Sequence, residues 1–150
     1  MTPDVDVLVA ASRSDHPHHA IARPWLDGAP AAAANGVSFT LMPMPMPVEL
    51  MLASLLRLVT SPKIFQVPTP TVNAVSFIDA MWAMPNVQLA NLGPEWPKLK
   101  QLCLDKQLSG NDLPDAWMAA AVDQRSEHLV SFDPGFKRPL ARSRFTLLTV

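Results

Sequence analysis

The sequence lacks the features that mark secreted and membrane-spanning proteins. Cys103 is the only cysteine in 150 residues, so an internal disulfide is excluded and a reducing cytoplasm is the expected compartment. Asp4 and Asp6 stand near the N-terminus, where a secretory signal would carry Lys or Arg. The most apolar stretch, 48–59, contains charged residues and is shorter than the ~20 apolar residues of a membrane helix. We therefore expect neither secretion nor contact with a membrane.

A large charge of one sign is also missing. The formal net charge is −1, which excludes a protein that is basic over its whole surface. The distribution is uneven, because residues 1–133 sum to −5 and residues 134–150 sum to +4. The positive segment contains Lys137, Arg138, Arg142 and Arg144. Any anionic partner is therefore expected near this segment. With 49% hydrophobic residues, the chain is expected to fold as one domain over residues 1–150.

Alternating apolar runs and turn residues predict an α/β fold. Helices are expected over 18–26, 48–60, 69–84, 94–108 and 113–127, and strands over 37–41, 87–92, 128–132 and 145–150. The alternation of Met and Pro over 42–47 predicts an extended, unpaired segment. Strands that alternate with helices form a mainly parallel sheet, and ligands bind beyond the carboxyl ends of its strands.

Several acidic residues stand at the ends of the expected elements. They are Asp4, Asp6, Glu49, Asp112, Asp115 and Asp133. Each has an ordinary alternative, such as helix capping for Asp112 and Asp115 or an Asp-Pro-Gly turn at Asp133. If the expected sheet forms, however, several of these carboxylates converge at one edge. Two like charges ~4 Å apart repel by about 4 kcal/mol at an effective dielectric near 20, so such a cluster needs a cation. An all-oxygen cluster suits Mg²⁺ or Mn²⁺ and best serves phosphodiester hydrolysis.

Five segments in this order resemble PIN-domain ribonucleases and, among them, the VapC toxins of bacterial toxin–antitoxin pairs. They are Pro3–Ala11 (PDVDVLVAA), Asp15–Ala20 (DHPHHA), Leu56–Pro62 (LRLVTSP), Asn111–Ala116 (NDLPDA) and Leu129–Asp133 (LVSFD). The resemblance implies a PIN-like, mainly parallel sheet of about five strands flanked by helices. It also implies a short first strand over 2–5, with Asp6 opening a helix.

The resemblance implies the site residues as well. Asp4, Asp115 and Asp133 match the family's metal-binding acids, Asp112 matches an accessory acid, and Glu49 matches the assisting Glu of a subset of VapC toxins. The implied protein is a homodimer that cleaves RNA with Mg²⁺ or Mn²⁺ and is neutralised by a VapB-type antitoxin. Because the acids repel phosphate, RNA is expected to be held by cations at their border, namely Arg13, Arg57, Lys137 and Arg138. Two departures from the family pattern are Asp6, where Asn is usual, and Gly135, where a second acid often follows Asp133.

Other interpretations stay open. Asp4-Val5-Asp6 also matches the D-x-D of haloacid-dehalogenase-type phosphatases, although that site needs a full apolar strand before the first Asp. A catalytically inactive PIN fold could serve as a binding module. Zinc and Cu(I) sites are disfavoured at the histidine and methionine clusters, which contain His16, His18 and His19, and Met42, Met44 and Met46. Cys103 is expected to pack in the interior, and core or interface positions are expected for Trp82, Trp96 and Trp117.

Overall fold

The computed structural model describes residues 1–28, 35–36, 39–41, 48–84, 87–89 and 94–149, and for residues 39, 41, 48–51 and 89 it describes the backbone only. Its helices are α1 (Val5–Ser12), α2 (His19–Asp27), α4 (Val48–Val59), α5 (Thr71–Trp82), α6 (Trp96–Lys106) and α7 (Leu113–Gln124). Its strands are β1 (Thr2–Pro3), β2 (Phe39–Leu41), β3 (Val87–Leu89), β4 (Leu129–Ser131) and β5 (Phe145–Leu147). Three short 3₁₀ helices complete the order: η1 (Gly110–Asp112), η2 (Pro134–Lys137) and η3 (Arg142–Arg144). The Met-Pro segment 42–47 lies outside the described residues.

The chain begins with a strand that turns directly into a helix. The amides of Thr2 and Asp4 donate to the carbonyls of His128 and Val130, which fixes β1 beside β4. Asp4 is the N-cap of α1, with extended backbone angles and a carboxylate that accepts from the Val5 amide. The short first strand is therefore confirmed, and the helix begins one residue before the expected Asp6.

The strands are all parallel but do not form the expected single sheet of about five strands. The structure has a three-stranded sheet in the order β1-β4-β5 and a separate two-stranded sheet of β2 and β3. Pro3 explains the break, because alternate residues of a strand bond to alternate neighbours and Pro3 has no amide proton to donate away from β4. One described hydrogen bond joins the two sheets, from the Thr40 amide to the Met1 carbonyl (2.8 Å).

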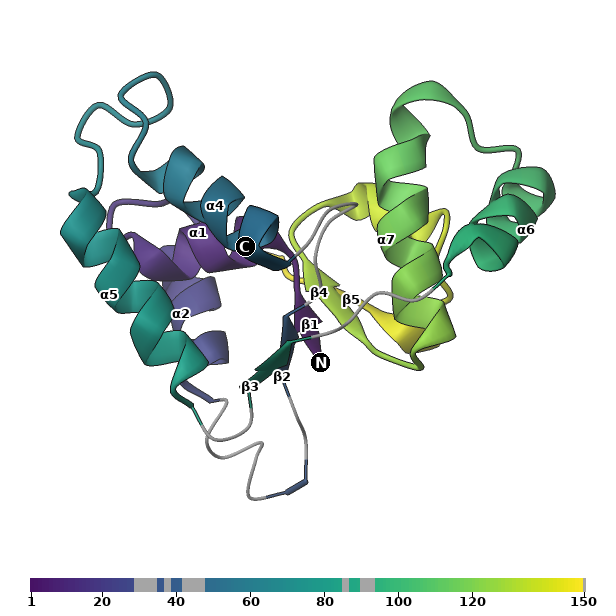
Figure 1. Ribbon diagram of the computed structural model, residues 1–150, viewed down its shortest axis with the longest axis horizontal. Helices are drawn as coiled ribbons and strands as arrows, with labels where there is room; N and C mark the ends of the chain where they lie inside the picture. Colours follow the sequence, from purple (N-terminus) through teal and green to yellow (C-terminus); the bar gives the residue numbers. More distant parts are fainter. Residues whose placement is uncertain (29–34, 37–38, 42–47, 85–86, 90–93, 150) are drawn as a thin grey trace.

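Helices cover both sides of the sheets. In Figure 1, α1, α2, α4 and α5 lie on one side of the strands, and α6 and α7 lie on the other. The first group buries apolar side chains such as Leu8 and Leu55, and the second packs Met118, Leu129 and Phe136 together. Among the described residues, no helix is long and apolar enough to cross a membrane. This α/β layering places the carboxyl ends of β1 and β4, together with the N-terminus of α7, around one edge.

Candidate active site

Asp4 and Asp6 meet at one buried hydroxyl group. The Ser131 Oγ, on β4, lies 2.9 Å from Asp4 Oδ2 and 3.0 Å from Asp6 Oδ2, and it accepts from the Asp133 amide. Asp6 Oδ2 also accepts from the Phe132 amide, whereas Asp6 Oδ1 is buried with no hydrogen-bond partner among the described residues. One hydroxyl proton thus serves two carboxylates at the carboxyl end of β1 and β4.

Asp115 and Asp133 approach the same edge from two other elements. Asp115 lies in the first turn of α7, and Asp133 follows β4 as the N-cap of η2, where it accepts from the Gly135 amide (2.7 Å). A methyl group built on Gly135 would lie 3.0 Å from Asp133 Oδ1 and 3.3 Å from Asp115 Oδ2. Gly135 therefore leaves room for two carboxylates that a larger residue would crowd.

The surroundings of Asp4, Asp6 and Asp115 disfavour the ionised form of each carboxyl group and so raise its pKa. Burial raises the pKa of Asp4 from 3.8 to about 7, and the charges of Asp6 and Asp115 add to this rise. Burial also raises the pKa of Asp6, against the hydrogen bonds from Ser131 and Phe132. The pKa of Asp115 is raised by burial first and then by the charges of Asp133 and Asp112. A bound cation would relieve this repulsion.

The donor chemistry of the cluster fits Mg²⁺ or Mn²⁺, since every donor is a carboxylate or hydroxyl oxygen. Asp6 Oδ1 is buried and accepts no hydrogen bond from a described residue, so it is a further oxygen that could bind a cation. Within the described part of the chain, no three acidic, histidine or cysteine side chains are close enough together to hold one metal ion. Binding would thus require the carboxylates to draw together, as expected when a cation replaces mutual repulsion.

Glu49 and Asp112 differ from the three central acids. Glu49 is the second residue of α4, and its side chain lies outside the described residues. Asp112 forms a capping box with Ser109 at η1 and an ion pair with Arg138 (3.2 Å). Its side chain does not cap α7, so the capping expected of Asp112 serves the short 3₁₀ turn instead.

Comparison with known proteins finds relatives of the whole chain. The chain is 38% identical to ribonuclease VapC31 of Mycobacterium tuberculosis over 136 residues, which cover 90% of this chain and 89% of the relative. Ribonucleases VapC25 (38%) and VapC43 (34%) of the same organism match over 136 residues as well, with 89% and 86% of those chains covered. No model of a protein family matches the chain. The chain belongs to the VapC ribonuclease family.

The short first strand of this VapC-family chain argues against the phosphatase alternative. Its D-x-D signature needs the first Asp at the end of a full apolar strand, whereas β1 has two residues and α1 begins directly after Asp4. Asp6 therefore lies on the helix, where it binds Ser131 and Phe132.

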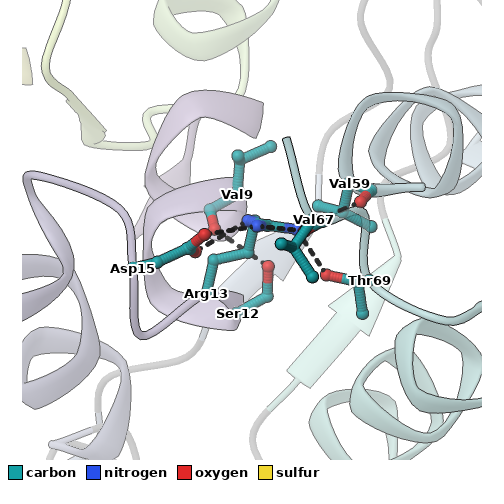
Figure 2. A network of polar contacts seen from close by, with 7 residues as sticks. All are labelled: Val9, Ser12, Arg13, Asp15, Val59, Val67 and Thr69. Atoms are coloured by element: carbon teal, nitrogen blue, oxygen red, sulfur yellow. Dashed lines mark hydrogen bonds and ion pairs between the residues drawn. The ribbon is translucent and has the colours of Figure 1, made fainter. Parts of the chain in front are cut away.

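Arg13, expected at the border of the site, has a structural position instead. It is 5% exposed and lies at the end of α1 opposite Asp4. Figure 2 shows its guanidinium between α1 and the segment that follows α4, where it donates to the Val59 and Val67 carbonyls and to Thr69 Oγ1. The same group pairs with Asp15 and lies 3.7 Å from the ring centroid of Phe65. With its donors used in this way, Arg13 holds α1 against the segment after α4, and its position does not support the expected RNA contact.

The other three expected RNA-binding cations fall into two groups. Arg57, on α4, and Lys137, on η2, are exposed. Arg138 is tied to the C-terminus of α6 as well as to Asp112, since it donates to the carbonyls of Lys106 and Gln107. Arg138 therefore fastens α6 to η1, a role that its sequence position did not indicate.

The remaining residues singled out in the sequence have varied surroundings. His18 packs against Phe132 (ring centroids 4.3 Å apart) and edge-on against His16. Cys103 is half-buried and packs against the α6–α7 core, as expected. The sequence predicts core or interface positions for Trp82, Trp96 and Trp117. Their side chains are 45%, 66% and 37% exposed, so a core position is wrong for them, and an interface position stays a prediction.

Ser131 and Gly135 are the parts of the site that the sequence interpretation missed or read differently. Ser131 is the one polar residue in an otherwise apolar strand, two residues before Asp133, and this is the signal that marks it. Gly135 stands out in the sequence as a missing acid, whereas in the structure its lack of a side chain makes room for Asp133 and Asp115.

Proposed function

We propose that this VapC-family protein is a metal-dependent endoribonuclease toxin, built as a single PIN domain over residues 1–150. The observation that carries the proposal is the convergence of Asp4, Asp115 and Asp133 beside Ser131 and Gly135 at one edge. Three separate chain segments supply these acids, and the pKa values of Asp4 and Asp115 are raised. Clusters of this kind are typical of functional sites.

In this proposal Asp4, Asp115 and Asp133 hold Mg²⁺ or Mn²⁺, with Glu49 and Asp112 assisting. The cation, when bound, supplies an activated water molecule and stabilises the charge that develops on the phosphate. Ser131 orients the Asp4 carboxylate through its 2.9 Å hydrogen bond. The Asp133 carboxylate is held by the Gly135 amide, so hydrogen bonds orient both Asp4 and Asp133 at this edge.

The deciding experiment is a cleavage assay on total RNA. Cleavage should require Mg²⁺ or Mn²⁺ and should stop in EDTA. Asp105→Asn is the matched control, because Asp105 is an exposed acid on α6 outside the cluster and its loss should leave the rate unchanged. Full activity in EDTA would exclude the metal mechanism.

We further propose that a VapB-type antitoxin neutralises the protein in the cytoplasm. No basic side chain forms an ion pair with Asp4, Asp115 or Asp133 among the described residues. An arginine of the antitoxin could pair with such free carboxylates in a bidentate manner. The genetic test is a small adjacent reading frame that encodes a protein with an Arg-bearing C-terminal part. A neighbourhood without such a gene counts against the toxin role.

A homodimer is the proposed assembly. An apolar groove of about 410 Å³ lies between α6 and α7, lined by Trp96, Leu99, Cys103, Leu113, Pro114 and Trp117. Exposed apolar surface of this kind is typical of protein interfaces. Sedimentation equilibrium should give twice the chain mass, and Trp96→Glu should lower it towards the monomer if this groove is the interface. A monomeric parent protein would exclude the homodimer.

A further inference from the structure

The four cations of the C-terminal segment are not equivalent in the structure. Arg138 pairs with Asp112, and Arg144 donates to the Glu127 carbonyl and lies 4.0 Å from Asp123. Lys137 and Arg142, in contrast, form no side-chain hydrogen bond or ion pair with any other described residue. Two cations thus anchor the fold and two remain available to bind an anion.

The two available cations line the same cavity. This cavity has a volume of about 470 Å³, and its walls are Lys137, Leu140, Arg142, Phe145 and Leu147. Cavities of roughly 300–1,000 Å³ are typical of small-molecule sites. Two cations above an apolar wall that includes an aromatic ring suit a ligand with both a negative charge and a flat apolar surface. A nucleotide combines these in its phosphate and its base.

The cavity lies next to the acid cluster. Lys137 ends η2, the helix that Asp133 caps, and four residues at the ~2.0 Å rise of a 3₁₀ helix separate the two by about 8 Å. At the other wall, Leu147 pairs in register with Ser131, and the Leu148 amide donates to the Ser131 carbonyl. Leu147, on the cavity wall, is therefore the β5 neighbour of Ser131, whose hydroxyl group binds Asp4 and Asp6.

We propose that this cavity is a nucleotide subsite, in which Lys137 and Arg142 bind a phosphate next to the scissile one while Phe145 and Leu147 contact the base. This inference rests on the proposed ribonuclease function, since it places a nucleotide of the RNA substrate. Of the four cations in the positive C-terminal segment, it assigns Lys137 and Arg142 to substrate binding and leaves Arg138 and Arg144 to the fold. Because phosphate and base contacts of this kind are tolerant of sequence, the subsite positions RNA more than it selects a base.

Binding of mononucleotides in EDTA tests the subsite separately from catalysis, because without a cation the acid cluster repels phosphate. Adenosine monophosphate should bind at least fivefold more tightly than ribose 5-phosphate, measured by calorimetry. Lys137→Gln and Arg142→Gln should each weaken nucleotide binding about 3- to 10-fold. Lys63→Gln is the matched control, since Lys63 is exposed on the segment between α4 and α5 and should bind as the parent does.

Cleavage kinetics then connect the subsite to the substrate. Both variants should raise KM for a short oligoribonucleotide by a similar factor with kcat unchanged, because the cations touch a phosphate that does not react. Equal binding of adenosine monophosphate and ribose 5-phosphate, or nucleotide binding that survives both substitutions, would overturn the inference. Nucleotide binding by a parent protein that cleaves no RNA would instead retain the subsite and reject the ribonuclease proposal.

Discussion

The two ends of α1 show opposite solutions to the problem of burying charge. At its N-terminus, Asp4 is 6% exposed and shares one hydroxyl with Asp6, without an ion-pair partner among the described residues. At its C-terminus, Arg13 is 5% exposed and is surrounded by a carboxylate, two carbonyls, a hydroxyl and an aromatic ring (Figure 2). Eight residues of helix separate a site with unfavourable electrostatics from one that satisfies its charge.

This difference assigns the N-terminus of α1 to the candidate site and its C-terminus to the stability of the fold. Removing one member of a buried, fully paired charge network leaves its partners buried without a counterpart. Such a substitution therefore lowers the free energy of unfolding. A buried acid that is poorly paired lowers stability without metal, and a fold keeps such a group where a ligand compensates. Substitutions at the two ends of α1 should accordingly have opposite effects on stability and activity.

The largest effect is expected from Asp115→Asn. The substitution removes a charge that would bind the cation, so RNA cleavage in Mg²⁺ should fall by about 100- to 1,000-fold. The fold should remain, and the melting temperature of the metal-free protein should stay the same or rise, because repulsion with Asp133 is relieved. Cleavage by Asp115→Asn at the rate of the Asp105→Asn control would remove Asp115 from the site.

At the other end of α1, Arg13→Met should destabilise the protein by about 2–4 kcal/mol in urea unfolding. The substitution keeps a long apolar side chain but leaves the Val67 carbonyl without its described donor and Asp15 without its ion-pair partner, whereas the Val59 carbonyl still accepts from the Thr69 amide. Arg23→Met is the matched control, because Arg23 forms an exposed i,i+4 pair with Asp27 and should cost under about 0.5 kcal/mol. A stable Arg13→Met protein with a raised KM for RNA would return Arg13 to the RNA path.

The stability of the metal-free protein should depend on pH through Asp4, at the N-terminal end of α1. The native pKa of Asp4 is about 7, above its unfolded value of 3.8, so the native state holds a proton that the unfolded chain releases. Asp4 therefore makes its whole contribution to the free energy of unfolding below pH 3.8, and this contribution is lost as pH rises towards 7. Asp4→Asn removes the titration and keeps an acceptor for the Val5 amide.

The Asp4→Asn variant should therefore be more stable than the parent at pH 8, by about 1–3 kcal/mol, and no more stable near pH 3.5. Thermal unfolding in EDTA at both pH values measures the difference. A gain of the same size at both pH values would show that packing, and not charge, is responsible. Saturating Mg²⁺ should reduce the gain at pH 8, because the cation stabilises the ionised parent.

The α/β class and the edge where the acids meet could be predicted from the sequence, because strand ends and helix starts are local signals. Asp115 and Asp133 are each adjacent in sequence to the turn that positions them. The split of the sheet could not be predicted, since it depends on which neighbour Pro3 faces once β1 pairs with β4. The burial of Arg13 was equally hidden, because its carbonyl partners are 46 and 54 residues away.

The smallest expected effect distinguishes two neighbouring cations at the border of the acid cluster. For single strands, the slope of log K against log salt changes by about 0.7 for each phosphate that a protein neutralises. Lys137→Gln should flatten the slope by that amount, whereas Arg138→Gln should change it less, because the Arg138 guanidinium already pairs with Asp112 and two carbonyls. A salt titration of RNA binding in Ca²⁺, chosen to occupy the site while limiting turnover, measures both slopes. Equal flattening by the two variants would mean that RNA displaces Asp112 from Arg138, and the ion pair would then be a contact that substrate binding exchanges.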